Sequence, residues 1–119
     1  MIPHGVEIFV GLQPIDLRWG FERLAGLVEE RLGRPTRSGA LFVFFGKRRS
    51  ALKVLFYDGT GLCLFYKRLE TGRFRLPPVD ADAQSVALDA TQLAMLLDGI
   101  DVAEVKRQPA WTPPGRTGT

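Results

Sequence analysis

Apolar and polar positions alternate in blocks through residues 41–76, and this pattern predicts an antiparallel β-meander. Short polar segments that contain glycine separate the apolar runs. The expected strands span residues 41–45, 52–57, 62–66 and 73–76. Asp58 and Gly59 give the strongest turn signal, because glycine adopts the positive φ that tight hairpins need. Two prolines follow the last run and end the sheet, since proline cannot donate to a strand ladder.

A helix is predicted on each side of the meander in the sequence. Residues 17–32 carry apolar side chains at spacings of three and four, which is the pattern of one helical stripe. Asp16 is the expected N-cap of this helix, and Gly33 is expected to end it. The second helix is expected to follow Asp89, which forms a capping-box pattern with Gln92.

The remaining segments complete a small α+β domain. Residues 6–10 have strand character, and residues 86–88 form a short extended piece after an acidic loop. The predicted order is β-α-β-β-β-β-α, with one antiparallel sheet and both helices packed on one face. We expect a single α+β domain over residues 1–105. Residues 106–119, rich in proline, glycine and threonine, are expected to form a flexible C-terminal tail.

Composition indicates in which cellular compartment the protein is expected. No stretch approaches the roughly 20 apolar residues of a membrane span, and the N-terminus lacks the pattern of a secretory signal. We therefore expect a cytoplasmic protein without a membrane partner. Cys63 is the only cysteine, which excludes an internal disulfide and a cysteine-based zinc cluster. Its place in an apolar run favours a small buried side chain.

Charge is distributed unevenly, although the net charge is only +3. The stretch from residue 47 to residue 75 contains eight bases and two acids, whereas the rest of the chain has eight bases and eleven acids. A local excess of bases creates a field that attracts anionic partners. The eight bases are therefore the candidate DNA-binding residues. They are Lys47, Arg48, Arg49, Lys53, Lys67, Arg68, Arg73 and Arg75.

The strand pattern allows two interpretations of the sheet surface. In the first, Lys53 and Tyr57 share an exposed face with Phe65 and Lys67, and this mixture of bases and aromatic rings suits phosphates and nucleobases. In the second, the same lysines are solvated and only protect the sheet from aggregation. The three consecutive bases that start at Lys47 are the stronger indication of nucleic-acid binding, because they lie on one turn.

The sequence offers no constellation that is typical of catalysis. His4, the only histidine, lies near the N-terminus with no cysteine or acidic pattern beside it. Asp16, Asp58 and Glu70 could be imagined as a metal-binding triad for phosphoryl transfer. A helix cap and two hairpin turns explain these acids more simply. We therefore expect no catalytic residue, no metal site and no cofactor.

Three blocks of the sequence resemble one known family. The first starts at Ile15-Asp16-Leu17-Arg18 and continues into the first helix, and the third runs from Leu88 through QLAMLLDGID to Asp101. The second and most distinctive is LKVLFYDGTGLCLFYKRLETGRFRLP, at residues 52–77. In this order the blocks are similar to the accessory transposition protein of insertion sequence 66 elements. That protein is the TnpB-type product of the second open reading frame.

The resemblance implies a role in the transposition of a mobile DNA element. In that family the strand-cutting DDE transposase is a separate and larger chain, and the resemblance assigns no biochemical activity of its own to this one. The implied partners are the element-encoded transposase and another accessory protein, and element-end DNA is a further partner hypothesis that rests on the clustered bases. Two functions remain open: a DNA-binding accessory factor, and a protein–protein adaptor that recruits or regulates the transposase without contacting DNA.

Overall fold

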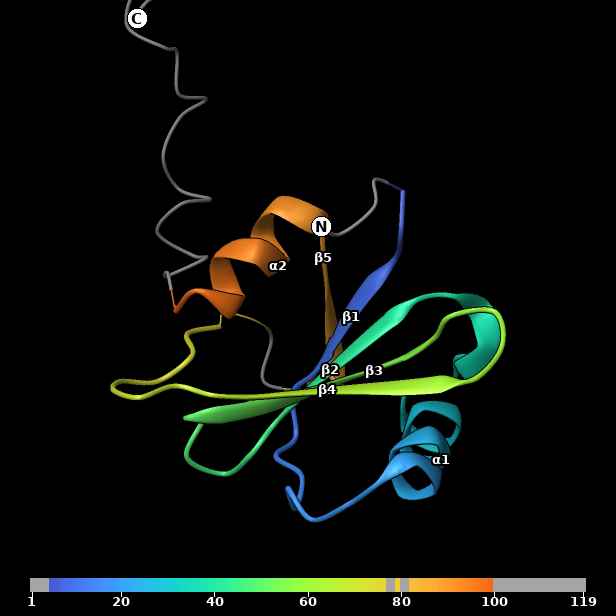
Figure 1. Ribbon diagram of the computed structural model, residues 1–119, viewed down its shortest axis with the longest axis horizontal. Coiled ribbons are helices and arrows are strands. Elements are labelled where there is room, and N and C mark those ends of the chain that lie inside the picture. The colour runs from blue at the N-terminus through green and yellow to red at the C-terminus, as the bar shows by residue number, and fades with distance from the viewer. Residues whose placement is uncertain (1–4, 77–78, 80–81, 100–119) are drawn as a thin grey trace, which may run out of the picture.

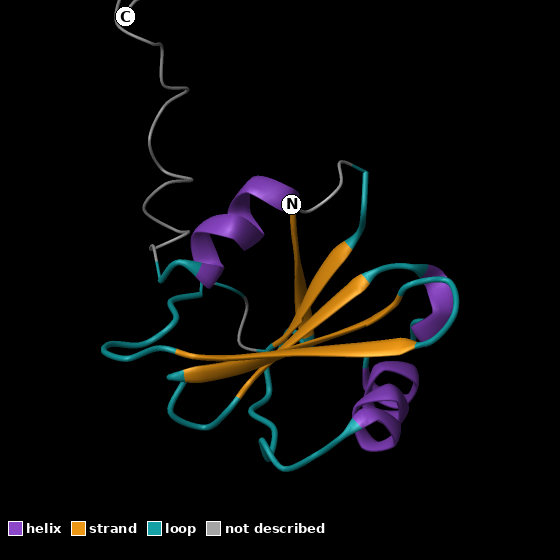
Figure 2. Ribbon diagram, in the orientation of Figure 1, coloured by secondary structure: helices purple, strands orange, loops and turns teal. Residues whose placement is uncertain are grey.

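A five-stranded sheet forms the centre of the molecule. The computed structural model describes residues 5–76, 79 and 82–99. The strands are β1 (Ile8–Gly11), β2 (Leu41–Phe45), β3 (Ala51–Tyr57), β4 (Leu62–Arg68) and β5 (Ser85–Leu88). They lie side by side in the order β4-β3-β2-β1-β5 (Figure 1). The two α-helices are α1 (Phe21–Arg31) and α2 (Ala90–Leu97), and a short 3₁₀ turn, η1 (Thr36–Ser38), precedes β2 (Figure 2).

The predicted α+β class is confirmed, but the sheet is mixed and not wholly antiparallel. Strands β1 and β2 are parallel neighbours, with Phe9 opposite Phe42. The other three strand pairs are antiparallel. The parallel pair arises because α1 lies between β1 and β2 in the sequence, and a helical crossover returns the chain in the same direction.

The prediction that both helices pack on one face of the sheet is wrong. Leu24 and Val28 of α1 pack in one core cluster with Phe9 and Phe42, whereas α2 packs in a second cluster with Ile8. Neighbouring residues of β1 point to opposite faces, so the clusters lie on opposite sides of the sheet (Figure 1). The central strands are apolar on both faces, and each face therefore needs its own helix.

The predicted strand at residues 73–76 does not form. The backbone N–H of Phe74 instead donates to the carbonyl of Arg49 at 2.8 Å, and the Phe74 ring is buried against Phe45. The last strand is β5, which includes the extended piece predicted at residues 86–88. It pairs antiparallel with β1. The sheet thus gains its fifth strand from the segment before α2.

The first helix begins later than the sequence predicted. Its N-cap is Gly20, and Asp16 has a different role. The Asp16 carboxylate accepts from the Arg18 guanidinium at 2.7 Å and from the Arg18 backbone N–H at 2.9 Å. These hydrogen bonds, with the side-chain bond the stronger cause, lower the pKa of Asp16 to about 2. Residues 17 and 18 consequently form a turn before α1.

The capping box of the second helix is confirmed. The Asp89 carboxylate accepts from the Gln92 N–H at 2.7 Å, and the Gln92 side chain accepts from the Asp89 N–H at 2.9 Å. Gly33 and Gly99, both with positive φ, follow the last residues of α1 and α2. The predicted tail at residues 106–119 lies outside the described residues.

The turn between β3 and β4 forms at the predicted Asp58-Gly59. One oxygen of the Asp58 carboxylate accepts from the backbone N–H groups of Thr60 and Gly61, at 2.9 and 3.0 Å, and from the Thr60 hydroxyl. These bonds, with the Thr60 N–H first, lower the pKa of Asp58 to about 2. Cys63 is half-buried close to this turn, and desolvation raises the pKa of its thiol.

Candidate nucleic-acid interface

The turn between β2 and β3 presents three consecutive bases. The Gly46 N–H donates to the Ala51 carbonyl at 3.1 Å, and the Arg49 N–H donates to the Gly46 carbonyl at 3.0 Å, which closes a β-turn. Arg49 then adopts a left-handed conformation with φ of 57°. Lys47, Arg48 and Arg49 are all exposed on this turn.

A pocket of about 300 Å³ opens beside this turn. We call it the basic pocket, and its lining residues are Ile15, Leu17, Gly46, Lys47, Arg48, Arg49, Ser50, Ala51 and Arg68. The Ile15 N–H donates to the Phe45 carbonyl at 2.9 Å, which fixes the segment before α1 against the end of β2. Leu17 packs on Gly46 so closely that a Cβ there would lie 2.6 Å from a Leu17 methyl carbon. An apolar wall therefore lies next to the basic side chains.

Four bases and no acid line the basic pocket. Three come from the β2–β3 turn, and the fourth, Arg68, comes from the end of β4, where its guanidinium donates to the Tyr66 hydroxyl at 3.0 Å. A concave site with charges of one sign concentrates the electrostatic potential and favours an anionic ligand.

Arg73 and Arg75 belong to a segment that lies beside the basic pocket. Both are exposed, and they are the sequence neighbours of Phe74. Because the Phe74 N–H is bonded to the Arg49 carbonyl, this segment lies directly beside the basic turn. Figure 1 shows the two segments at the same end of the sheet. The structure thus brings six of the eight predicted bases to one end of the molecule.

Lys53 does not belong to this surface. Its side chain is 7% exposed, and its Nζ donates to the Trp19 carbonyl at 2.8 Å and lies 5.2 Å from the centre of the Tyr66 ring. The lysine is therefore part of the packing between β3 and the segment before α1. An ammonium group that is buried and already hydrogen-bonded cannot reach a phosphate.

Lys67 contacts the second helix. Its Nζ donates to the Leu97 carbonyl at 2.7 Å, at the C-terminus of α2. A cation at this position interacts favourably with the helix dipole and satisfies one of the last free carbonyls. Lys67 thus has a structural partner, away from the basic pocket.

The proposed mixed face of bases and aromatic rings is wrong. Lys53 is paired with Tyr66, and Val54 is paired with Phe65. Directly opposed residues share a face, so Lys53 lies on the α1 side of the sheet and Phe65 lies on the α2 side. The aromatic residues on β4 are exposed because β4 is an edge strand.

The sequence did not identify Ile15 and Leu17 as lining residues. Leu17 was assigned to the first helix because it fits the apolar spacing. The available signal was Arg18 two residues after Asp16, which offers that carboxylate an ion pair at 2.7 Å in place of a capping role.

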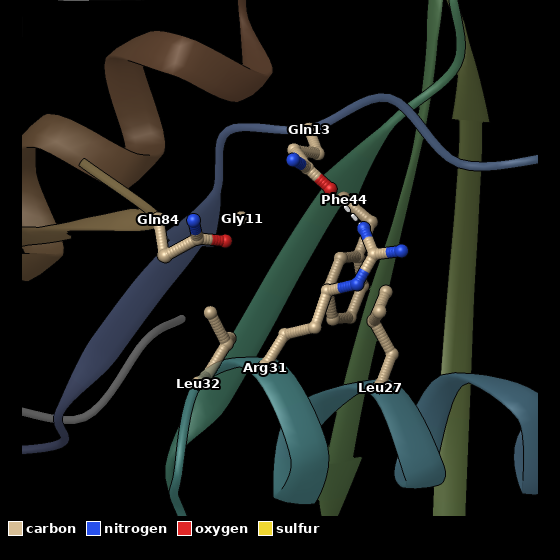
Figure 3. A pocket seen from close by; sticks show the side chains of 7 residues that line it. All are labelled: Gly11, Gln13, Leu27, Arg31, Leu32, Phe44 and Gln84. Carbon is tan, nitrogen blue, oxygen red and sulfur yellow. Dashed lines mark hydrogen bonds between the residues drawn. The ribbon is translucent and has the colours of Figure 1, made fainter. Parts of the chain in front are cut away.

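A second and much smaller pocket lies between α1 and the sheet. Figure 3 shows the Arg31 side chain, which extends from α1 across the Phe44 ring and donates to the side-chain oxygen of Gln13. Leu27, Leu32, Gly11 and Gln84 complete the lining. The cavity volume of about 10 Å³ is sufficient for about one water molecule. The residues around this pocket connect α1 with the chain after β1. The pocket itself is too small for an organic ligand.

The acidic residues form no cluster in the described part of the chain. Asp16 is bound by Arg18, and Asp58 closes a hairpin turn. Within residues 5–76, 79 and 82–99, no three side chains of histidine, cysteine, aspartate or glutamate are grouped to hold a metal ion. Neither described helix has the length and apolar character that crossing a bilayer requires.

Known proteins give an independent comparison. A family model described as IS66 Orf2 like protein matches residues 6–107. Two uncharacterized proteins of Sinorhizobium fredii strain NGR234 are also similar. Protein y4hO is 42% identical over 115 residues, which cover 95% of this chain and 96% of the relative. Protein y4jC is 37% identical over 110 residues, which cover 92% of each chain.

No solved structure matches this protein. The family match nevertheless extends from just before β1 to beyond α2, and the relatives match over almost their whole length. The resemblance inferred from the three sequence blocks is therefore confirmed. The chain belongs to the IS66 Orf2-like family and has an accessory role associated with transposition.

Proposed function

We propose that this protein binds the phosphates of element-end DNA through the basic pocket, as a non-catalytic accessory factor in transposition. The convergence of Lys47, Arg48, Arg49 and Arg68 on one pocket without an acid carries the proposal. These side chains come from two separate parts of the chain, so the fold and not a simple run of sequence creates the site.

The chemistry of the pocket suits a phosphate diester. Guanidinium groups bind phosphate oxygens through two parallel hydrogen bonds, and a lysine adds a compact charge. The apolar wall of Ile15 and Leu17 limits competing hydration on one side. Phosphate contacts carry little sequence information, so any preference for element ends would require a second protein or DNA shape.

The positions of the acids support a non-catalytic role. Asp16 and Asp58 already accept hydrogen bonds from Arg18 and from the β3–β4 turn. In this proposal strand cutting belongs to the separate transposase, and the present chain positions DNA for it.

An adaptor function is the second candidate, because aromatic side chains are exposed on β4. Phe65 is 45% exposed and Tyr66 is 48% exposed. Aromatic residues are enriched in the buried centres of protein interfaces. In this alternative the chain would recruit or regulate the transposase without contacting DNA.

Salt-dependent binding to duplex element-end DNA tests the proposal. We expect the double substitution Lys47→Ala/Arg48→Ala to reduce affinity about tenfold for each lost contact, since charge-assisted hydrogen bonds are lost. The slope of log affinity against log salt should fall by about 0.9 for each lost contact. Fluorescence anisotropy at several salt concentrations measures both quantities.

The matched control is Arg34→Ala/Arg37→Ala, which changes the net charge by the same amount. Arg37 lies over the ring of Tyr57, at the end of β3 opposite the basic pocket. We expect this control to keep the parent slope. Equal effects of the two double substitutions, or no DNA binding by the parent at low salt, would contradict the proposal. Binding that appears only with the transposase would favour the adaptor.

A further inference from the structure

The outer edge of β4 is the longest open edge of the sheet. β4 has seven residues and lies at one end of the strand order, whereas β5 at the other end has four (Figure 1). In the described part of the chain, β3 is the only strand that pairs with β4. An open edge of this length presents a row of unpaired backbone groups that can accept another strand.

Two hydrogen bonds determine which backbone groups of β4 point outward. The Asp58 N–H donates to the Gly61 carbonyl at 3.1 Å, and the Leu69 N–H donates to the Ser50 carbonyl at 2.9 Å. Bonded and non-bonded pairs alternate along an antiparallel ladder. Counting inward from both ends through the register assigns the bonds with β3 to Cys63, Phe65 and Lys67. The outward N–H and carbonyl groups therefore belong to Leu62, Leu64, Tyr66 and Arg68.

We propose that this edge pairs with the same edge of a second copy of the chain, as an antiparallel β4–β4 dimer. The two-fold axis would pass beside Phe65, and all seven residues of β4 would take part. The opposed pairs would be Leu62 with Arg68, Cys63 with Lys67, Leu64 with Tyr66, and Phe65 with itself. In this register the outward N–H and carbonyl groups of one β4 strand lie opposite those of the other strand, so they can form hydrogen bonds.

The sequence of β4 favours this register over its neighbours. In the full register the two bases lie opposite Leu62 and Cys63, and no base faces a base. A register centred on Lys67 would place like charges directly opposite each other, which destabilises a strand pair. Registers centred on Leu64 or Tyr66 would lose two of the seven opposed positions. The full register is thus the one that uses the whole edge without repulsion.

The same register covers the exposed aromatic side chains. Phe65 and Tyr66 are 45% and 48% exposed, and each would gain an apolar neighbour across the new strand pair. Phe65 would face Phe65 in a non-hydrogen-bonded pair, where opposed side chains come closest. The dimer would contain one continuous sheet of both copies, with the two basic pockets at opposite ends of the paired strands. The ends of β4 would separate them by about 20 Å along the strand direction.

The first test compares two substitutions of Tyr66 in the full-length chain. Tyr66→Pro removes an outward N–H, whereas Tyr66→Ala removes the side chain and keeps that donor. Neither removes a bond to β3, because Tyr66 and Lys53 form a non-hydrogen-bonded pair in the derived alternation. In sedimentation equilibrium we expect the parent and Tyr66→Ala to associate and Tyr66→Pro to stay monomeric, with unchanged far-ultraviolet circular dichroism.

The second test detects the proximity of the two β4 strands by disulfide formation, and it does not depend on the Tyr66→Pro variant. In a Cys63→Ser background, Phe65→Cys would place two thiols at the two-fold axis. The Cα atoms of such a pair lie about 4.5 Å apart, within the range that a disulfide spans. The control is Phe21→Cys in the same background, because Phe21 is 46% exposed and Phe65 is 45% exposed. We expect mild oxidation to yield covalent dimers of the Phe65→Cys chain only.

Each result decides for or against the β4 dimer, independently of DNA binding. A parent chain that stays monomeric throughout the micromolar range would overturn it, and so would equal cross-linking at residues 65 and 21. Association of a folded Tyr66→Pro chain at parental strength would do the same. If that variant fails to fold, the cross-linking comparison alone decides.

Discussion

Gly46 allows the start of the basic turn to pack directly against Leu17. A Cβ at residue 46 would lie 2.6 Å from one Leu17 methyl carbon and 2.9 Å from its Cγ. We expect Gly46→Ala to displace Leu17 and to lower the free energy of unfolding by about 1–3 kcal/mol, the usual cost of overpacking. Urea denaturation at neutral pH measures this change. The displaced Leu17 should also alter the basic pocket, so DNA affinity is a second readout.

Gly26 provides the matched control for this substitution. It lies inside α1, and a Cβ there would meet nothing within 4 Å. Gly26→Ala should raise the free energy of unfolding by about 0.5–1 kcal/mol, because alanine restricts the unfolded chain and favours helix. If both substitutions shift stability in the same direction, the close contact of Gly46 with Leu17 is not the cause.

Asp16 and Lys53 show why single residues were misinterpreted from the sequence. Asp16 precedes an apolar helical stripe, yet Arg18 binds it locally and the helix starts later, at Phe21. Lys53 alternates with apolar residues, which suggested a solvated position. Its partner is the carbonyl of Trp19, 34 residues away, and such a contact exists only after the sheet and the segment before α1 have met.

At the scale of the elements, Lys67 and the capping box stabilise α2 from its two ends. α2 has no basic residue in its own last turn, and the Lys67 ammonium group donates to the Leu97 carbonyl. We expect Lys67→Met to lower the free energy of unfolding by about 1 kcal/mol, because it removes a charged hydrogen bond at the helix C-terminus. Hydrogen exchange of the α2 amides should become faster. Both changes can be followed in the same sample.

Lys47→Met is the control for Lys67, since it removes the same charge from the exposed basic turn. It should leave exchange in α2 unchanged and reduce the salt dependence of DNA binding. Lys67→Met should leave that salt dependence close to the parent value. The reverse assignment of the two effects would show that Lys67 is the DNA contact.

Elements defined by local chemistry could be predicted from the sequence, and those defined by distant pairing could not. The Asp58-Gly59 turn and the Asp89 capping box depend on residues within three positions of each other, so their patterns are visible. Residues 73–76 have a strand-like pattern, but Phe74 enters the core beside Phe45. The edge position next to β1 is taken by β5, and this competition between segments is a property of the assembled sheet.

At the scale of the whole molecule, the sheet is covered on both faces, and the central strands carried a signal for this. Ile8, Phe9 and Val10 are consecutive, apolar and buried, although neighbours in a strand point to opposite faces. β2 shows the same continuous pattern. Such runs are typical of strands that are buried on both sides, so one helix on each face was available as a prediction. The basic turn could be predicted because its bases are consecutive, whereas the contribution of Arg68 depends on the β3–β4 register.

Hydrogen exchange of the folded chain should distinguish the interior strands of the sheet from its edge strands. Amides of β1, β2 and β3, which each have a neighbouring strand on both sides, should exchange most slowly, because they open only when the domain unfolds. In β4 the protection should alternate in the dilute chain. The amides of Cys63, Phe65 and Lys67 should be slow, while those of Leu62, Leu64, Tyr66 and Arg68 should be fast.

The dependence of this exchange on protein concentration distinguishes an open β4 edge from a paired one. In the β4 dimer the outward amides become hydrogen-bonded, so the alternation should disappear as the protein concentration rises. The Tyr66→Pro chain should keep the alternation at every concentration at its remaining outward amides. Two-dimensional NMR of exchange in deuterated buffer resolves these amides individually. Protection of the outward amides in the dilute parent and in Tyr66→Pro alike would mean that another segment of the same chain covers β4. The two-fold pairing would then be excluded.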